Sequence, residues 1–115
     1  MITRKENRPK YKKANLRGGS GDLGFLDITT RETLPKKLRL CSEITLKSGE
    51  SIGEHLHEGE AEIYYCLSGV GTVLDMGKEV KIYPGDSAVT NLDDPHYIKN
   101  EGSEDLKILA TIVLD

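Results

Sequence analysis

The stretch Gly49-Glu-Ser-Ile-Gly-Glu-His55-Leu-His57-Glu-Gly-Glu-Ala-Glu62 decides how this chain is interpreted. It places two histidines two residues apart and a glutamate five residues after the second. On a β-strand, residues i and i+2 share a face, so His55 and His57 can present two imidazoles to one point. Glu62 can add a carboxylate oxygen from the next strand. The stretch therefore predicts β structure that carries part of a metal site.

The third histidine completes the predicted ligand set. His96 lies near the end of the chain, in Asp94-Pro-His96-Tyr-Ile-Lys-Asn100. Together with His55, His57 and Glu62 it offers nitrogen and oxygen ligands without a thiolate, which suits a first-row divalent ion. Such a set leaves about two open positions on an octahedral ion. Those positions fit a small oxygen-rich chelator such as a carboxylate.

The remaining pattern predicts an almost entirely β chain. Apolar and polar residues alternate most clearly over residues 38–47, and no segment shows a helical stripe of the usual length. Further strands are expected at residues 61–67, 71–74, 79–83, 87–90, 97–99 and 106–114. Many short strands separated by Gly and Pro turns predict a sandwich or a barrel. A closed barrel can hold a ligand inside.

Strand parity extends the predicted site beyond Glu62. Tyr64 and Cys66 share the face of Glu62, and the residues between them point the other way. Tyr64 is our candidate catalytic residue, able to donate a proton or a hydrogen bond; the alternative is a barrel-lining ring with its hydroxyl on water. For Cys66 we expect a buried, inert thiol rather than a metal contact. The apolar residues on the opposite face need cover from the second sheet, the arm or a partner subunit, which favours an oligomer and first of all a two-fold homodimer.

Other polar residues are weaker candidates. Glu58 and Glu60 precede the predicted carboxylate ligand and are expected to be solvated loop charges. Arg17 and Lys99 could hold a substrate carboxylate, but both are expected at the surface. Asn100 shares the face of the last histidine and could orient a ligand.

Length and composition limit the classes of protein. The 115 residues suffice for one domain, and the net charge of -3 argues against nucleic acid as a main partner. No apolar run reaches about 18 residues, so no membrane span is expected. The N-terminus lacks the apolar segment of a secretory signal, so we expect a cytoplasmic protein. Cys41 and Cys66 are then expected to be two reduced thiols.

Charge divides the chain into two parts. Residues 1–17 contain seven Lys/Arg and one Glu, a balance of +6, whereas the rest has a balance of -9. The basic segment is either a solvated, partly disordered tail or an arm that lies on the acidic body of its own or a neighbouring subunit. Residues 18–21, Gly-Gly-Ser-Gly, are expected to form a flexible turn or linker. We therefore predict an arm at residues 1–22 and a barrel at residues 23–115.

The motifs resemble those of the cupin superfamily. Gly49, His55, His57, Glu62 and Gly69 fill every place of its first motif. Its second motif is matched at Gly85, His96 and Asn100, and the chain departs from it at Asn91 and Asp93, where the pattern has Pro and Gly. The resemblance implies a double-stranded β-helix, or jelly-roll barrel. It also implies a metal, with Mn or Fe as our first expectation and Ni, Zn or Co as alternatives.

The arm and glycine run also resemble those of small one-domain bacterial cupins described as oxalate-decarboxylase-like. Three functions stay open. The chain could be a metal-dependent decarboxylase, dioxygenase or isomerase acting on a small acid. It could instead bind a small carboxylate without turnover, or use the metal only to stabilise the barrel. The family includes all three, so the fold does not decide between them.

Overall fold

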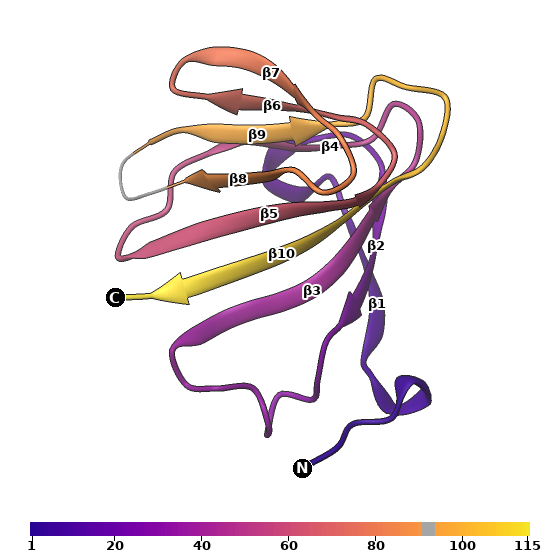
Figure 1. The fold of residues 1–115 in the computed structure, drawn as a ribbon, viewed down its shortest axis with the longest axis vertical. Coiled ribbons are helices and arrows are strands. Elements are labelled where there is room, and N and C mark those ends of the chain that lie inside the picture. The colour runs from indigo at the N-terminus through magenta and orange to yellow at the C-terminus, as the bar shows by residue number, and fades with distance from the viewer. Residues whose placement is uncertain (91–93) are drawn as a thin grey trace.

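The chain folds into two antiparallel sheets that face each other (Figure 1), in a computed structural model that describes residues 1–90 and 94–115. The six-stranded sheet has the order β1-β2-β3-β10-β5-β8 and the four-stranded sheet the order β4-β9-β6-β7. The strands are β1 (Lys10–Ala14), β2 (Asp22–Asp27), β3 (Leu38–Leu46), β4 (Ser51–His55), β5 (Glu60–Ser68), β6 (Gly71–Asp75), β7 (Lys78–Ile82), β8 (Ser87–Thr90), β9 (His96–Lys99) and β10 (Leu106–Leu114). Two short 3-10 turns, η1 (Lys5–Asn7) and η2 (Leu16–Gly18), flank β1.

The core forms where the inner faces of the two sheets meet. β10 pairs with both β3 and β5, and its side chains alternate between buried and more exposed positions as the sequence pattern predicts. The buried apolar side chains come from both sheets: Leu23, Phe25, Ile44, Leu46, Ile52, Tyr64, Cys66, Val73, Ile82, Ile98, Leu106, Ile108 and Ala110. The predicted jelly-roll architecture is therefore confirmed. No helix in the described part of the chain is long and apolar enough to cross a membrane.

The basic N-terminal segment lies on the body of its own chain. β1 pairs in an antiparallel manner with β2 and becomes the edge of the larger sheet. Arg8 forms an ion pair of 2.7 Å with Glu43 of β3. A freely solvated tail is thus the wrong interpretation of residues 10–14. The division into an arm (residues 1–22) and a barrel (residues 23–115) stays a prediction. Asn91 and Asp93 lie outside the described residues.

The glycine-rich segment at residues 18–21 packs tightly, and our expectation of a flexible linker is wrong. The Ser51 amide of β4 donates to the Ser20 carbonyl at 3.0 Å, and the Ser20 amide donates to the Ser51 hydroxyl at 3.0 Å. A Cβ on Gly19 would lie 2.2 Å from the Ser51 carbonyl oxygen, so only glycine fits there. The glycines therefore permit a close approach of two backbones rather than flexibility.

Candidate metal centre

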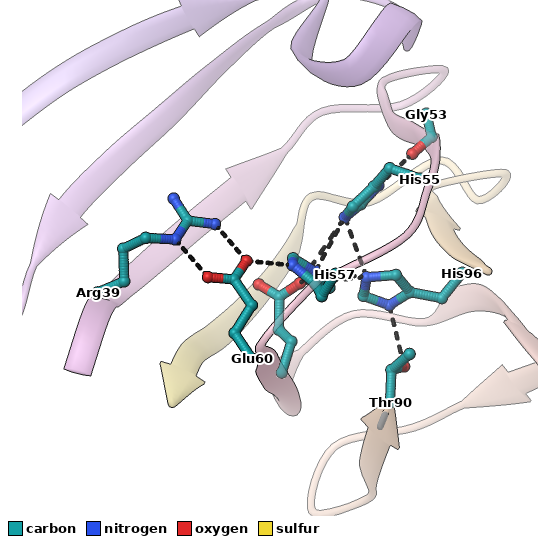
Figure 2. A network of polar contacts seen from close by, with 8 residues as sticks. Arg39, Gly53, His55, His57, Glu60, Thr90 and His96 are labelled. Atoms are coloured by element: carbon teal, nitrogen blue, oxygen red, sulfur yellow. Dashed lines mark hydrogen bonds and ion pairs between the residues drawn. The ribbon is translucent and has the colours of Figure 1, made fainter. Parts of the chain in front are cut away.

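The ligand atoms of the four predicted side chains lie within 4.8 Å of one another. Figure 2 shows the three histidine rings pointing toward one another. His55 ends β4, His57 follows in the loop, Glu62 lies in β5 and His96 begins β9. The three histidine Nε2 atoms lie 3.0–3.2 Å from one another. A Glu62 carboxylate oxygen lies 2.8 Å from Nε2 of His57 and 3.2 Å from that of His96. Three of the four residues are buried and His55 is nearly so.

An irregularity in β4 aims His55 at this point. Ile52 pairs with Ile98, and His55 pairs with His96, so β4 advances three residues while β9 advances two. Such a bulge turns the following side chain to the other face of the strand. Without it, the buried face of Ile52 would continue at Glu54 rather than at His55. Simple strand alternation therefore does not explain why His55 and His57 meet. The bulge turns His55 inward, and His57 lies beyond the end of β4.

Each histidine is held through its other ring nitrogen (Figure 2). Nδ1 of His55 lies 2.7 Å from the Gly53 carbonyl oxygen, and Nδ1 of His57 lies 2.6 Å from a Glu60 carboxylate oxygen. Both oxygens can only accept, so both Nδ1 atoms carry the proton. Nδ1 of His96 lies 3.0 Å from the Thr90 hydroxyl, which can accept in the same way. The Nε2 lone pairs are consequently directed toward a common centre.

Glu60 is part of the site, and the expectation that it is a solvated loop charge is wrong. Its residue is only 8% exposed, and Arg39 donates to both carboxylate oxygens, at 2.7 and 2.8 Å. Hydrogen bonding to Arg39 lowers the pKa of Glu60 to about 2. Glu58, by contrast, is exposed as expected. Because Glu60 lies two residues before Glu62 on the same strand, its parity already placed it on the inner face.

The sequence gives no signal for Arg39 or Thr90. Arg39 reaches Glu60 from β3, across a non-local contact that spacing in one strand cannot indicate. Thr90 lies in a strand that the sequence predicts, opposite Glu62 in the register of β5 and β8. That register becomes known only when the sheet is assembled.

The cluster has a strongly perturbed electrostatic environment. Burial alone would raise the pKa of Glu62, but the three neighbouring imidazoles, which donate to its carboxylate through Nε2 when they are protonated, outweigh burial and hold that pKa well below its usual range. Hydrogen bonding to Glu62 in turn raises the pKa of His57, although burial acts in the opposite direction. Glu62 is therefore a carboxylate at any ordinary pH. It supplies a negative charge at the centre of three imidazoles.

Tyr64 lies beside this cluster, and its hydroxyl is shielded from bulk solvent. The ring stacks on His96, with centroids 5.2 Å apart, and the residue is 2% exposed. Its hydroxyl is buried without a hydrogen-bond partner among the described residues. Burial, followed by the charge of Glu62, raises the pKa of the Tyr64 phenol well above its usual value. The side chain is thus a protonated, buried donor, and such a group is expected to meet a ligand or a water.

Other candidates from the sequence lie elsewhere. Asn100 is buried, but its amide donates to the carbonyls of Leu46 and Glu104 in a loop, so a role in orienting a ligand is wrong. Lys99 pairs with exposed Glu79 at 2.8 Å on the surface, as expected. Cys66 is fully buried and donates weakly to backbone carbonyls, and burial raises the pKa of its thiol. Its buried position agrees with the parity prediction, and its inertness stays a prediction.

A cavity of about 190 Å³ opens next to the histidines. His55, His57, Glu62 and Tyr64 form its inner wall. Three basic residues also line it: Lys13 and Arg17, which precede β2, and Arg39 of β3. Arg17 is exposed as expected, yet it faces this cavity rather than only the solvent. A small anion would therefore meet positive charge at the cavity and the ligand cluster beneath it.

The ligand cluster could hold a metal ion. Ligands in cis positions about 2.1 Å from one ion lie about 3.0 Å apart. The observed Nε2–Nε2 distances of 3.0–3.2 Å agree with that edge. Three lone pairs directed at one point also repel each other unless a cation or a proton lies between them. Both the spacing and the chemistry of the donor atoms therefore fit a divalent ion.

Comparisons with known proteins agree with this geometry. The cupin-domain family matches residues 42–112. An oxalate-binding protein of Thermotoga maritima is 40% identical over 114 residues, which cover 99% of this chain and 94% of that protein. The crystal structure of a predicted oxalate decarboxylase from Thermotoga maritima aligns over 100% of this chain and 100% of that one, with 39% identity and a TM-score of 0.91. A sugar phosphate isomerase of the cupin superfamily from Silicibacter pomeroyi has a TM-score of 0.80 at 16% identity, over 100% of this chain and 76% of that one.

The chain belongs to the cupin family, because the family match covers more than half of it and a close relative spans nearly all of it. The resemblance inferred from the two histidine motifs is thereby confirmed. At 16% identity the isomerase likeness concerns the fold alone.

Proposed function

We propose that this cupin binds a small dicarboxylate, with oxalate as the first candidate, at a divalent metal held by His55, His57, Glu62 and His96. The convergence of three Nε2 atoms within 3.2 Å, each imidazole fixed through Nδ1, carries the proposal. The basic cavity beside them suits an anion. The oxalate-binding relative, 40% identical, supports the choice of ligand.

For the metal we propose Mn or Fe, with Ni, Zn or Co as alternatives. The hard carboxylate of Glu62 beside three imidazoles suits all of these ions. When bound, the ion would supply a Lewis acid with about two positions open to carboxylate oxygens. The protein supplies fixed imidazole orientations through the Nδ1 contacts with Gly53, Glu60 and Thr90.

We propose that Tyr64 donates a hydrogen bond to the bound carboxylate. Its hydroxyl is buried, lacks a partner among the described residues and lines the cavity. Because its pKa is raised, the phenol stays protonated and serves as a donor rather than as a base. Tyr64→Phe should weaken oxalate binding by roughly 10- to 100-fold, the cost of a hydrogen bond to a charged group. Metal content should not change.

The direct test is calorimetric titration of oxalate into the manganese-loaded and the metal-stripped protein. Binding should appear only with metal, and His57→Ala should abolish both metal loading and oxalate binding while the barrel stays folded. Equal binding with and without metal would overturn the proposal. Unfolding of the stripped barrel would instead favour a purely structural metal.

We infer binding without turnover rather than catalysis. A decarboxylase or isomerase needs an acid or base beyond the ligands. Among the described cavity residues Glu62 belongs to the ligand cluster, neighbouring Glu60 is ion-paired with Arg39, and the raised pKa of Tyr64 makes its phenol a poor proton donor. Incubation of the metal-loaded protein with oxalate, followed by assays for formate and carbon dioxide, should detect no product. Product formation that His57→Ala abolishes would establish the enzyme instead.

We also propose a homodimer, formed through the outer face of β5 and β8. The exposed apolar side chains on this face are Ile63, Tyr65, Leu67 and Val89. Such a patch is self-complementary across a two-fold axis. Light scattering should give a dimer mass for the wild type and a monomer mass for Ile63→Lys with Val89→Lys. A monomeric wild type would refute the proposed homodimer.

We also propose a cytoplasmic location, which the two free thiols support.

A further inference from the structure

Arg17 has an unusual backbone conformation for its residue type. Its φ is 55° and its ψ is 30°, in the left-handed region, and neighbouring Asn15 has a φ of 50°. Asparagine tolerates this region, whereas arginine adopts it rarely and with strain. Residues held in such conformations concentrate at ligand sites, where the surrounding structure fixes them. The conformation of Arg17 therefore invites a functional explanation.

The loop that carries Arg17 is fixed against the metal-site strand. A Cβ on Gly53 of β4 would lie 2.2 Å from the Arg17 carbonyl oxygen, so the two backbones are in direct contact. The Gly18 amide donates to the Asn15 carbonyl at 3.0 Å, and the Asn15 amide donates to the Gly21 carbonyl at 2.8 Å. In Figure 1 the turn η2 lies beside β4. Arg17 thus keeps a fixed place relative to His55, two residues after Gly53.

Arg17 brings a positive charge to the cavity that the ligand cluster also lines. It shares this cavity with His55, Glu62 and Tyr64. The guanidinium therefore lies among the groups that would surround a bound ligand.

The other two basic residues of the cavity are already engaged. Arg39 is ion-paired with Glu60 at 2.7 Å, and the Lys13 ammonium lies 5.1 Å from the centre of the Phe25 ring. For Arg17, no carboxylate of residues 1–90 or 94–115 lies within ion-pair distance. A planar guanidinium offers two parallel N–H donors that match a carboxylate. Arg17 is consequently available for an anion that enters the cavity.

We propose that Arg17 binds the outer oxygens of a dicarboxylate whose inner oxygens face the histidines and Glu62. The inference rests on the proposed function and deepens it. The ligand cluster alone would accept any small chelating acid, whereas Arg17 favours an acid with two outer oxygens. Arg17, in the basic segment before β2, thus determines the preference for dicarboxylates. This role explains why an arginine with a strained backbone occupies this position of the loop.

The test compares two ligands in three proteins. Oxalate and glycolate, which has one outer carboxylate oxygen, are titrated into the manganese-loaded full chain of the wild type, Arg17→Gln and Arg4→Gln. Arg4 is exposed near the N-terminus and provides a matched control. Arg17→Gln should weaken oxalate binding roughly 10- to 100-fold and glycolate binding less, while manganese affinity stays unchanged. Arg17→Lys should give an intermediate loss, because it keeps the charge without the fork.

Arg17→Gly separates ligand binding from a structural role. Glycine adopts the left-handed region without strain, so this variant should unfold at no lower temperature than the wild type and still lose oxalate affinity. If the manganese-loaded wild type does not bind oxalate, the proposed function and this inference both fall. If the wild type binds oxalate and the oxalate affinity of Arg17→Gln lies within about twofold of the wild-type affinity, only the role of Arg17 is refuted.

Discussion

Replacing Glu60 with glutamine should weaken metal binding although Glu60 is not a predicted ligand. The carboxylate accepts from Nδ1 of His57 at 2.6 Å and from two guanidinium nitrogens of Arg39 at 2.7 and 2.8 Å. It fixes the His57 ring and makes its Nε2 a better donor to a cation. Glutamine keeps one oxygen for His57. Its amide NH₂ then faces the Arg39 guanidinium, which is also a donor.

The size of the loss in metal affinity depends on which hydrogen bonds of residue 60 survive the substitution. Loss of the partner that orients a histidine ligand typically costs 10- to 100-fold in metal affinity. Because glutamine still accepts a hydrogen bond from His57, we expect Glu60→Gln to lower the metal affinity roughly 10-fold, or by about 1.4 kcal/mol. Glu60→Ala removes the acceptor altogether and should approach 100-fold. The Arg39 contact adds little, because the Arg39 side chain is 46% exposed.

Competition titration of Mn²⁺ against a chelator measures these affinities at fixed pH. Glu58→Gln is the matched control, since Glu58 lies two residues earlier in the turn before β5, is exposed and carries the same charge. It should leave the affinity within about twofold of the wild type. Glu60→Gln with wild-type affinity, or Glu58→Gln with an equal loss, would refute the orientation of His57 by Glu60.

Three further predictions test other parts of the structure. Metal affinity should fall as pH drops through the raised pKa of His57, because its proton competes with the ion at Nε2; Mn²⁺ titrations across that range will show it. Gly53→Ala should destabilise the fold by roughly 1–3 kcal/mol in urea unfolding, whereas Gly24→Ala, whose Cβ would approach no described atom closer than 3.9 Å, should not. Iodoacetamide should label Cys41 before Cys66 in the folded protein, because Cys66 is fully buried and its thiol pKa is raised; equal rates by mass spectrometry would contradict this.

Much of this fold could be predicted because the strands follow simple rules. In β3 and β10 the alternation of apolar and polar residues matches the more buried and more exposed faces. Spacing in the sequence also brought His55, His57, Glu62 and His96 together, since each lies on or next to a strand that the pattern indicates.

The parts that the sequence did not predict depend on contacts between distant strands. The bulge in β4 changes which face His55 occupies, and nothing in the local alternation marks it. The parity of Glu60 places it on the inner face, but its partner Arg39 reaches it from β3, so the ion pair could not be inferred from the segment of Glu60 itself. The glycines at 18–21 allow a close backbone approach to β4, a use that composition does not distinguish from flexibility.

Anomalous diffraction at the manganese edge, from crystals grown with Mn²⁺ and oxalate, tests the central claim most directly. One anomalous peak should lie within bonding distance of Nε2 of His55, His57 and His96 and of a Glu62 carboxylate oxygen. Oxalate should occupy the remaining positions, with its outer oxygens toward Arg17. A manganese peak elsewhere, or oxalate bound away from it, would contradict the account.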